Sequence, residues 1–205
     1  MKLYTSIGPN PRVVRMFAAE KGLSLPQVEV DIIGGENRRQ PFLSINPAGQ
    51  TPVLELENGA ALAETAAICE YLEELFPEPA LIGATPQARA HTRMWARRVD
   101  LNFVQPITAG FRAAEGLPLF KNRVRCLPQA ADDLKQSGRE GLAWLEAQMD
   151  GRPYIAGDVV SMADILLFCF VEFGAAVGQP LDRNNRALAA WHDRMASRPS
   201  AAATA

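Results

Sequence analysis

The sequence has little of what marks several large classes of protein. No apolar run approaches the ~20 residues needed to span a bilayer, and no apolar stretch of the secretory type follows the first residues. The 21 basic and 23 acidic side chains are interspersed, with a net charge of -2, so no basic stripe favours nucleic acid or an anionic membrane. We therefore expect a cytoplasmic protein that acts on a small molecule and has no nucleic-acid or membrane partner.

Cysteine and histidine are scarce as well. The three cysteines, Cys69, Cys126 and Cys169, form no CxxC pair, and two of them lie in apolar surroundings. This argues against a disulfide framework or a zinc site. We expect the two histidines, His91 and His192, to be surface or packing residues. The sequence thus predicts reduced thiols and no bound metal.

The first part of the chain has the pattern of a small α/β domain. Strands and helices are expected to alternate at residues 2–5 (strand), 11–21 (helix), 27–33 (strand), 38–44 (short helix), 51–56 with 60–62 (hairpin) and 64–76 (helix). Asn58-Gly59 suits the tight turn of the hairpin. Gly22 is expected to end the first helix in a left-handed conformation.

The second part of the chain has a helical pattern only. Pro77 and Pro79 end the preceding helix, and residues 78–87 lack periodicity, so we place a linker there. Helices are expected at residues 87–115 with a bend at Pro106, 134–149, 162–176 and 184–197. The Ala-rich end, residues 201–205, is expected to be frayed.

One segment carries chemistry at fixed spacing. From Asn46 the chain reads NPAGQTPVLELENGAALAETAAICEYLEELFP. Pro52 lacks an N–H, which suits a sheet edge or a cis turn. Glu64 and Thr65 put a carboxylate and a hydroxyl beside the free N–H groups of a helix start, which suits a ligand carrying an ammonium and a carboxylate. An ordinary helix cap at Thr65 would explain the pair as well.

This segment resembles the NPxGxxPxLxxxxGxxLxExxAIxxYL pattern shared by cytosolic glutathione transferases. The earlier loop SIGPNPRVVR resembles that of the fungal second-type glutathione transferases and their bacterial relatives. The resemblance implies a bacterial protein with the glutathione transferase fold. Its α/β thioredoxin-like N-terminal domain would span 1–77 and its all-α C-terminal helical domain 88–205, with the linker at 78–87. It also implies glutathione as cosubstrate and a two-fold homodimer, formed by faces that carry Ala67, Glu70, Arg93, Met94 and Arg97.

The resemblance assigns glutathione contacts to single residues. A cis Pro52 would turn the backbone of Thr51 outward, so that it pairs with the cysteinyl part of glutathione like an added strand. Glu64 and Thr65 would hold the γ-glutamyl end, and Gln50 would approach the glutathione backbone.

A cation for the glycine carboxylate of glutathione would come from Arg38 or Arg39. Both arginines belong to the polar stretch GENRRQ. A solvated helix face explains them equally well.

A transferase must also lower the thiol pKa of glutathione from about 8.5. Relatives use a Tyr, Ser or Cys in the loop after the first strand, but the aligned serine and cysteine positions hold Gly8 and Asn10 here. Asn10 is the first candidate donor, because an amide N–H and the adjoining helix start both favour a thiolate, and a bacterial reductase group similarly uses Asn in this loop. Ser6 is the second candidate. A plain helix cap before Pro11 would also account for Asn10.

The helical half offers a folding signal and a candidate pocket. Ser161 and Asp164 form a capping box, which we interpret as structural. The electrophile is expected against the first long helix of this half. The candidate side chains there are Asn102, Phe103, Pro106, Ile107, Phe111 and Arg112.

The expected function is therefore a glutathione S-transferase that conjugates the thiolate of glutathione to small apolar electrophiles. Alternatives are a glutathione-dependent peroxidase or disulfide reductase, or a transferase-like protein that only binds glutathione or another ligand. Maleylacetoacetate isomerase is disfavoured because its SSC-type loop motif is missing.

Overall fold

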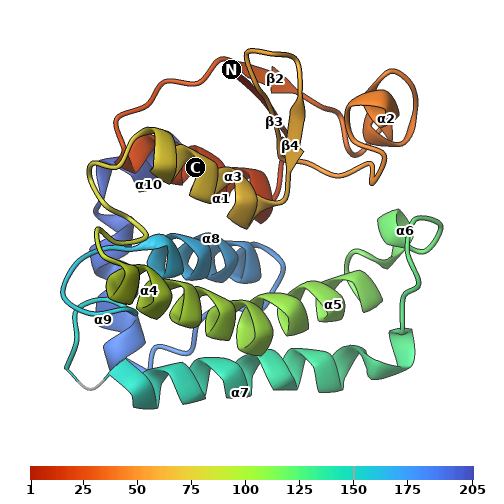
Figure 1. Cartoon of the computed structure of the whole chain (residues 1–205). Helices are drawn as coiled ribbons and strands as arrows, with labels where there is room; N and C mark the ends of the chain where they lie inside the picture. Colours follow the sequence, from red (N-terminus) through yellow and green to blue (C-terminus); the bar gives the residue numbers. More distant parts are fainter. Residues whose placement is uncertain (150) are drawn as a thin grey trace. The chain divides into compact units, whose positions relative to one another are not determined.

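The computed structural model describes residues 1–149 and 151–205, which form two compact units (Figure 1). The first unit comprises Met1–Ile82 together with Pro199–Ala205, and the second comprises Gly83–Arg198. The first unit therefore extends past residue 77 and includes the end of the chain. The division into independent domains at 1–77 and 88–205 stays a prediction.

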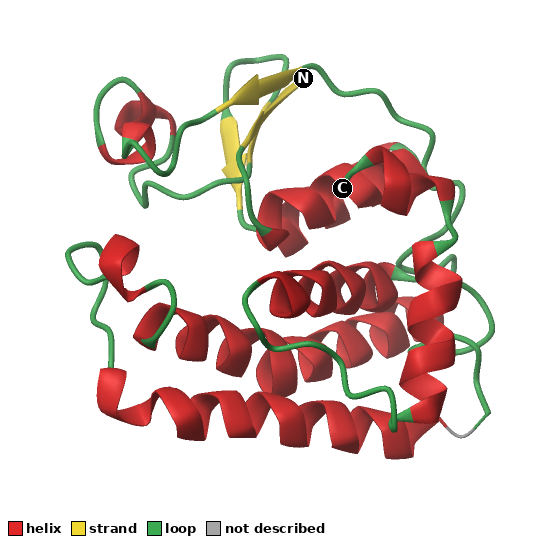
Figure 2. Ribbon diagram, turned by 180° about the vertical axis from the view of Figure 1, so that it is seen from behind, coloured by secondary structure: helices red, strands yellow, loops and turns green. Residues whose placement is uncertain are grey.

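The first unit is built on a sheet, drawn in yellow in Figure 2. It has four strands in the order β2-β1-β3-β4. The strands are β1 (Lys2–Thr5), β2 (Gln27–Glu29), β3 (Val53–Glu55) and β4 (Ala61–Ala63). β1 and β2 run parallel, whereas β3 is antiparallel to both β1 and β4. A helix connects the parallel pair, as such a crossover requires. The order confirms the predicted thioredoxin-like α/β arrangement.

The helices of this unit follow the predicted apolar pattern. They are α1 (Pro9–Glu20), the 3₁₀ turn η1 (Glu36–Arg38), α2 (Phe42–Ile45), α3 (Thr65–Leu75) and α10 (Pro199–Ala203). α1 buries Val13 and Phe17 and packs against α3, which buries Ile68 and Leu72. Gly22 follows the last turn of α1 with φ of 67°, as expected for a left-handed helix end.

The end of the chain is ordered, so the prediction of a frayed tail is wrong. α10 packs against α1 (Figure 1), and Ala201 and Thr204 are buried. Arg12 donates to the Ala201 carbonyl at 3.5 Å, and the Ser200 hydroxyl donates to the carboxylate of Glu20. An Ala-rich terminus has no local reason for order, but here partners far away in the sequence hold it.

A buried ion pair attaches the start of the predicted linker to the first unit. Lys21 Nζ lies 2.6 Å from Glu73 Oε2, and both side chains are essentially inaccessible to solvent. Lys21 also donates to the carbonyls of Phe76 and Pro79, and Glu73 accepts the backbone N–H of Ile82 at 2.7 Å. A buried pair tolerates its desolvation only when such additional hydrogen bonds are made. The chain up to Ile82 is thus fixed to the thioredoxin-like unit.

The described part of the second unit consists of helices and connecting segments, with one isolated β-bridge between Tyr154 and Gly157. The helices and helical turns are α4 (Pro86–Val99), the π-helical turn η2 (Asp100–Val104), α5 (Gln105–Ala113), α6 (Leu117–Phe120), the 3₁₀ turn η3 (Pro128–Ala130), α7 (Ala131–Met149), α8 (Met162–Ala176) and α9 (Arg186–Ala196). The apolar α8 forms the core, and α4 and α9 pack against it. This confirms the predicted helical C-terminal half.

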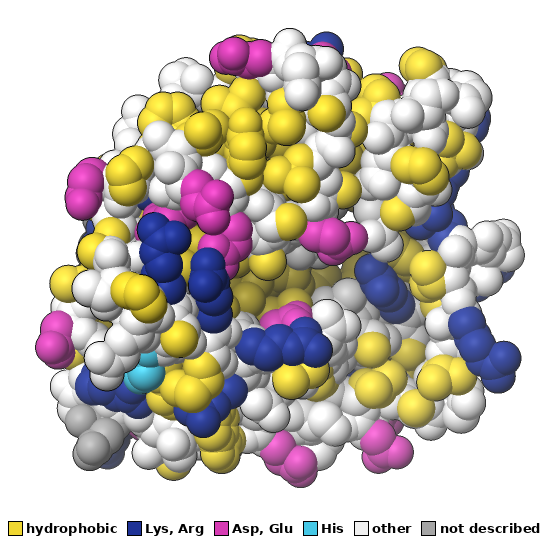
Figure 3. Space-filling view, in the orientation of Figure 1, with side chains coloured by type: hydrophobic (Ala, Val, Ile, Leu, Met, Phe, Trp, Pro, Cys, Tyr) yellow, Lys and Arg dark blue, Asp and Glu magenta, His cyan; other side chains and the backbone are white. Residues whose placement is uncertain are grey.

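The described residues contain no helix that is long and apolar enough to cross a membrane. On the face seen in Figure 3, basic and acidic side chains lie interspersed. That mixture agrees with the sequence, in which neither sign of charge dominates.

The start of α8 is organised by one buried carboxylate. Asp164 accepts hydrogen bonds from the N–H and hydroxyl of Ser161, from the N–H of Ile155 and from Nε1 of Trp191, at 2.7 to 2.9 Å. Burial raises the pKa of the Asp164 carboxyl, and these four donors act against that rise. The residue joins α8, the loop before it and α9, so its predicted structural role is supported by its contacts.

The long first helix of this unit is irregular just before Pro106, close to the predicted bend. A proline cannot donate to the carbonyl four residues earlier, which is that of Asn102. The chain forms a π turn there, with the Gln105 N–H bonded to Asp100 O. α7 approaches this point through Gly141, where an added Cβ would lie 1.9 Å from Asn102 O. The missing side chain at Gly141 is what allows the two helices to touch.

Two glycines of α7 provide a matched test of this contact. Gly141→Ala should destabilise the protein by about 3 kcal/mol, because its methyl group cannot fit without separating the helices. Gly138→Ala should be neutral or stabilising by up to about 1 kcal/mol, because alanine favours a helix and the nearest atom to the new Cβ lies 3.7 Å away. Thermal unfolding of both variants measures the difference. Equal stabilities would contradict the proposed close approach.

Candidate functional site

Two hydrogen bonds join distant segments of the first unit around the predicted site residues. The Ser6 and Thr51 hydroxyl oxygens lie 2.6 Å apart, and Thr65 donates its hydroxyl to Asn10 Oδ1 at 3.2 Å. The loop between β1 and α1 thereby contacts both the segment before β3 and the start of α3. Four of the residues predicted from the sequence are thus paired within one compact unit.

The Thr51-Pro52 peptide bond is cis, as the resemblance implied. Pro52 is buried and directly precedes β3, while Thr51 is half-buried. β3 pairs with a strand on each side, so the Thr51 backbone stands just before a central strand and not at an edge of the sheet. Pairing of the Thr51 backbone with a ligand stays a prediction.

The turn before Thr51 is held by two asparagine side chains. Asn46 Nδ2 donates to Gln50 O at 2.8 Å, and Asn37 Nδ2 donates to Gly49 O at 2.6 Å. Gly49 has φ of 61°, and a Cβ there would lie 2.7 Å from Asn37 O, so only glycine fits. Sequence analysis missed Asn37, since a polar stretch without periodicity gives no sign of a buried side chain.

The structure separates the two candidate arginines. Arg38 donates to Ala48 O at 3.4 Å and lies against Gly49, beside the turn that carries Gln50. Arg39 instead donates back to the carbonyl of Gly34 at 3.0 Å. Arg38 is the arginine of the two that neighbours the predicted binding segment.

Glu64 has an unusual backbone conformation. It is the single non-glycine residue with positive φ among the described residues, at 72°. A side chain in this region costs of order 1–3 kcal/mol, and such strain is concentrated at functional sites. Glu64 is exposed and directly precedes α3, at the helix end where the dipole favours a negative charge.

Thr65 and Asn10 are not the helix caps that the sequence allowed. α3 begins at Thr65 with Glu64 before it, and the Thr65 hydroxyl bonds to Asn10. α1 begins at Pro9, with Gly8 at the cap position, so Asn10 lies within the first helical turn. Both polar side chains are therefore directed toward each other instead of toward their own helix ends.

Ser6 is deeply buried, with 1% of its surface exposed, whereas Asn10 is partly exposed. The Ser6 hydroxyl also lies 3.2 Å from the Ile7 carbonyl, in addition to its contact with Thr51. Ser6 is thus suited to holding the loop, and Asn10 is the more accessible of the two candidate donors.

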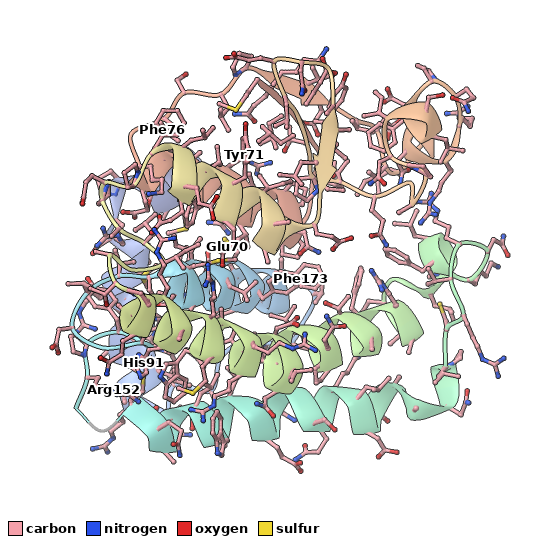
Figure 4. All side chains as sticks on the ribbon, viewed as in Figure 1. Glu70, Tyr71, Phe76, His91, Arg152 and Phe173 are labelled. Atoms are coloured by element: carbon pink, nitrogen blue, oxygen red, sulfur yellow. The ribbon has the colours of Figure 1, made fainter. Side chains whose placement is uncertain are left out.

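The predicted electrophile residues divide into core and partly exposed side chains. Phe103 and Ile107 are buried, 3% and 2% exposed, and lie close to Gly138 of α7. Phe111 is half-buried, with its ring 5.0 Å from that of Phe173, which is labelled on α8 in Figure 4. The Arg112 guanidinium lies 5.1 Å from the Phe120 ring centre. An electrophile pocket at these residues stays a prediction.

The remaining polar candidates have packing partners. His91, labelled in Figure 4, accepts a hydrogen bond from Trp95 Nε1 at 3.2 Å, and His192 lies 2.8 Å from Glu172. All three cysteines are free thiols. Among the described residues no cluster of His, Cys, Asp or Glu could hold a metal ion.

Comparison with known proteins agrees with this arrangement. Residues 3–80 match the model of the glutathione S-transferase N-terminal domain, and residues 98–199 match that of the C-terminal domain. The chain belongs to the glutathione S-transferase family.

Its relatives in this family include second-type enzymes. The chain is 35% identical to Glutathione S-transferase 2 of Saccharomyces cerevisiae, over 96% of its own length and 85% of the relative. The crystal structure of Gtt2 from that yeast superposes with a TM-score of 0.92 at 33% identity and covers all of both chains. The predicted resemblance to fungal second-type glutathione transferases is confirmed.

The family also contains relatives with other names. A maleylacetoacetate isomerase of Pseudomonas aeruginosa is 32% identical to this glutathione S-transferase family member, over 94% of this chain and 92% of the relative. Family membership therefore defines the fold without selecting one reaction.

The strained residue gives a test of the site. Glu64→Gly and Glu64→Ala should each weaken glutathione binding about 10-fold, because both remove a charged hydrogen-bonding group. Glu64→Gly should nevertheless be about 1 kcal/mol more stable than Glu64→Ala, because glycine adopts positive φ without strain. Calorimetric titration and thermal unfolding measure the two effects. Binding by Glu64→Gly at wild-type strength would show that the carboxylate is not a ligand group.

Proposed function

We propose that the protein binds glutathione through its first unit and adds the glutathione thiolate to small apolar electrophiles. The observation that carries the proposal is the pairing of Ser6 with Thr51 and of Asn10 with Thr65. Thr51 and Thr65 are the positions that the family motif assigns to two parts of glutathione. Both thiol-activating candidates are therefore bonded to a predicted glutathione contact.

The binding chemistry follows from the groups available. The Thr51 backbone would pair with the cysteinyl residue, and Glu64 with Thr65 would hold the γ-glutamyl ammonium and carboxylate. Gln50 would contact the glutathione backbone. Arg38 would attract the glycine carboxylate, since it lies beside that turn.

Asn10 is our first choice for stabilising the thiolate. Its Oδ1 accepts from Thr65, so the amide has its nitrogen, with two N–H donors, on the other side. Pro9 and Pro11 carry no N–H, which leaves the Asn10 backbone N–H as a further donor of the first turn. Ser6 is the second choice because of its burial.

In the proposed reaction the thiolate lone pair forms a carbon–sulfur bond with an electrophilic carbon. The electron pair of the bond that breaks leaves with the leaving group, or moves onto an activated double bond that is then protonated. Asn10 would act by stabilising negative charge on sulfur before the attack, and it takes up no proton itself.

The aromatic side chains around Phe111 support an apolar electrophile. Phe111 lies edge-to-face with Phe173 and Phe120, and the Arg112 guanidinium adds a cation over the Phe120 ring. Small-molecule pockets are lined mainly by hydrophobic and aromatic side chains. Phe103 and Ile107, also expected in this pocket, are buried in the core.

Reduction of peroxides or disulfides is the second candidate, since the same thiolate attacks oxygen or sulfur, and isomerisation is the third. The third is favoured by the isomerase relative and disfavoured by Gly8 and Asn10 in place of an SSC-type loop.

A cytoplasmic homodimer with a face at Glu70 and Met94 also stays a prediction.

Turnover assays test the proposal. Purified protein should bind immobilised glutathione and consume an aryl chloride in its presence. Parallel assays with a hydroperoxide, a mixed disulfide and a maleyl compound measure the competing reactions. Binding without turnover of any of the four would leave a non-catalytic glutathione-binding protein.

Asn10→Ala should raise the pKa of the bound glutathione thiol by about 1 unit, because a hydrogen bond to a charged group is worth ~1.5–3 kcal/mol. The thiolate absorbance of the complex, followed against pH, measures that pKa. Asn58→Ala, in the exposed hairpin turn, is the control and should leave the titration unchanged. An unchanged titration of Asn10→Ala would transfer the role to Ser6 or to a backbone N–H.

A further inference from the structure

Arg15 connects the candidate site to the end of the chain. It lies on α1 and is half-buried. Its Nη1 donates to Thr5 Oγ1 at 2.8 Å and lies 3.3 Å from Ser6 O, and its Nη2 donates to Thr204 O at 3.4 Å. One guanidinium thus bonds to the end of β1 and the loop after it with one nitrogen, and to the C-terminal segment with the other.

The residues that accept hydrogen bonds from Arg15 are all buried. Thr5, Ser6 and Thr204 are buried, 2%, 1% and 6% exposed. The C-terminal segment is also attached to α1 without Arg15, through the Arg12 bond to Ala201 O. Because a guanidinium is planar and rigid, its attachment to Thr204 limits where Nη1 can lie.

Ser6 connects Arg15 to Thr51 of the candidate site. The carbonyl of Ser6 accepts from Arg15, and its hydroxyl lies 2.6 Å from the hydroxyl of Thr51. A change in the position of the Ser6 backbone would therefore move its hydroxyl relative to Thr51. The Thr51 backbone, in turn, is the group expected to pair with the ligand.

We propose that Arg15 is a positioning residue for the glutathione site. It holds Thr5 and Ser6 against the ordered C-terminal segment and so keeps Ser6 in contact with Thr51. It does not itself contact glutathione. This inference rests on the proposed function, namely that Thr51 belongs to the glutathione site.

Arg15→Met tests the role, because methionine keeps much of the apolar stem and loses every donor. It should weaken glutathione binding about 10-fold, measured by calorimetric titration of the folded protein. Arg12→Met, one turn earlier, is the matched control. It loses a bond to the same C-terminal segment, so its melting temperature should fall too, but its glutathione affinity should stay within about 2-fold of wild type.

Arg15→Lys should recover part of the affinity. A single ammonium can bond to Thr5 Oγ1 but cannot span both the loop and Thr204 as the guanidinium does. If Arg15→Met fails to fold, Thr5→Val replaces it, since valine keeps the shape of threonine and removes the Oγ1 acceptor. Thr5→Val should weaken binding about 3-fold.

The route through Ser6 is tested by a double-mutant cycle. Ser6→Ala should itself weaken binding, and Arg15→Met combined with Ser6→Ala should bind about as well as the weaker single variant, because both remove the same contact. Fully additive losses would overturn the route through Ser6.

The failure of this inference is distinguishable from failure of the proposed function. If the wild-type protein does not bind glutathione, the proposed function is wrong. If the wild type binds and Arg15→Met binds equally well, the positioning role is overturned. It is also overturned if Arg12→Met and Arg15→Met weaken binding equally, since the loss would then reflect the packing of α1 in general.

Discussion

The Ser6 and Thr51 hydroxyls lie 2.6 Å apart, and the candidate site depends on this contact. It joins the loop after β1 to the segment that leads into β3, so the two cannot shift independently. Each side has its own support, since Arg15 holds the Ser6 carbonyl and Asn46 holds that of Gln50. A ligand that is bound by backbone groups needs those groups fixed within a fraction of an ångström, and side chains from other elements provide that here.

The start of α3 is also fixed by a side chain from another element, at a cost in local stability. Glu64 is held at a φ of 72°, and the Thr65 hydroxyl contacts Asn10 and does not cap its own helix. Both features sacrifice local stability, since a strained residue and an unused cap each cost about 1 kcal/mol or more. Such losses are usual where binding groups must converge, and they separate the residues of a site from those that only support the fold.

In the helical unit, the corresponding contacts stabilise the fold. Asp164 gathers four donors at the start of α8, and Gly141 lets α7 approach the carbonyl that Pro106 leaves without its usual partner. These contacts satisfy buried polar groups and set helix spacing, and none involves a thiol-activating candidate. The side chains expected to contact the electrophile are instead Phe111 and Arg112, which are partly exposed.

The sequence by itself determined the order of strands and helices through local periodicity and the family through a motif with fixed spacing. The cis bond before Pro52 was implied by the resemblance to that family. Only the tertiary structure decided that α10 packs against α1, that Arg38 and not Arg39 lies beside the turn before Thr51, and that Arg15 bonds to both Ser6 and Thr204. Ser6 bonds to a residue 45 positions away and Arg15 to one 189 positions away. No local pattern encodes such a partner, since it is brought near only when the sheet and α10 have packed.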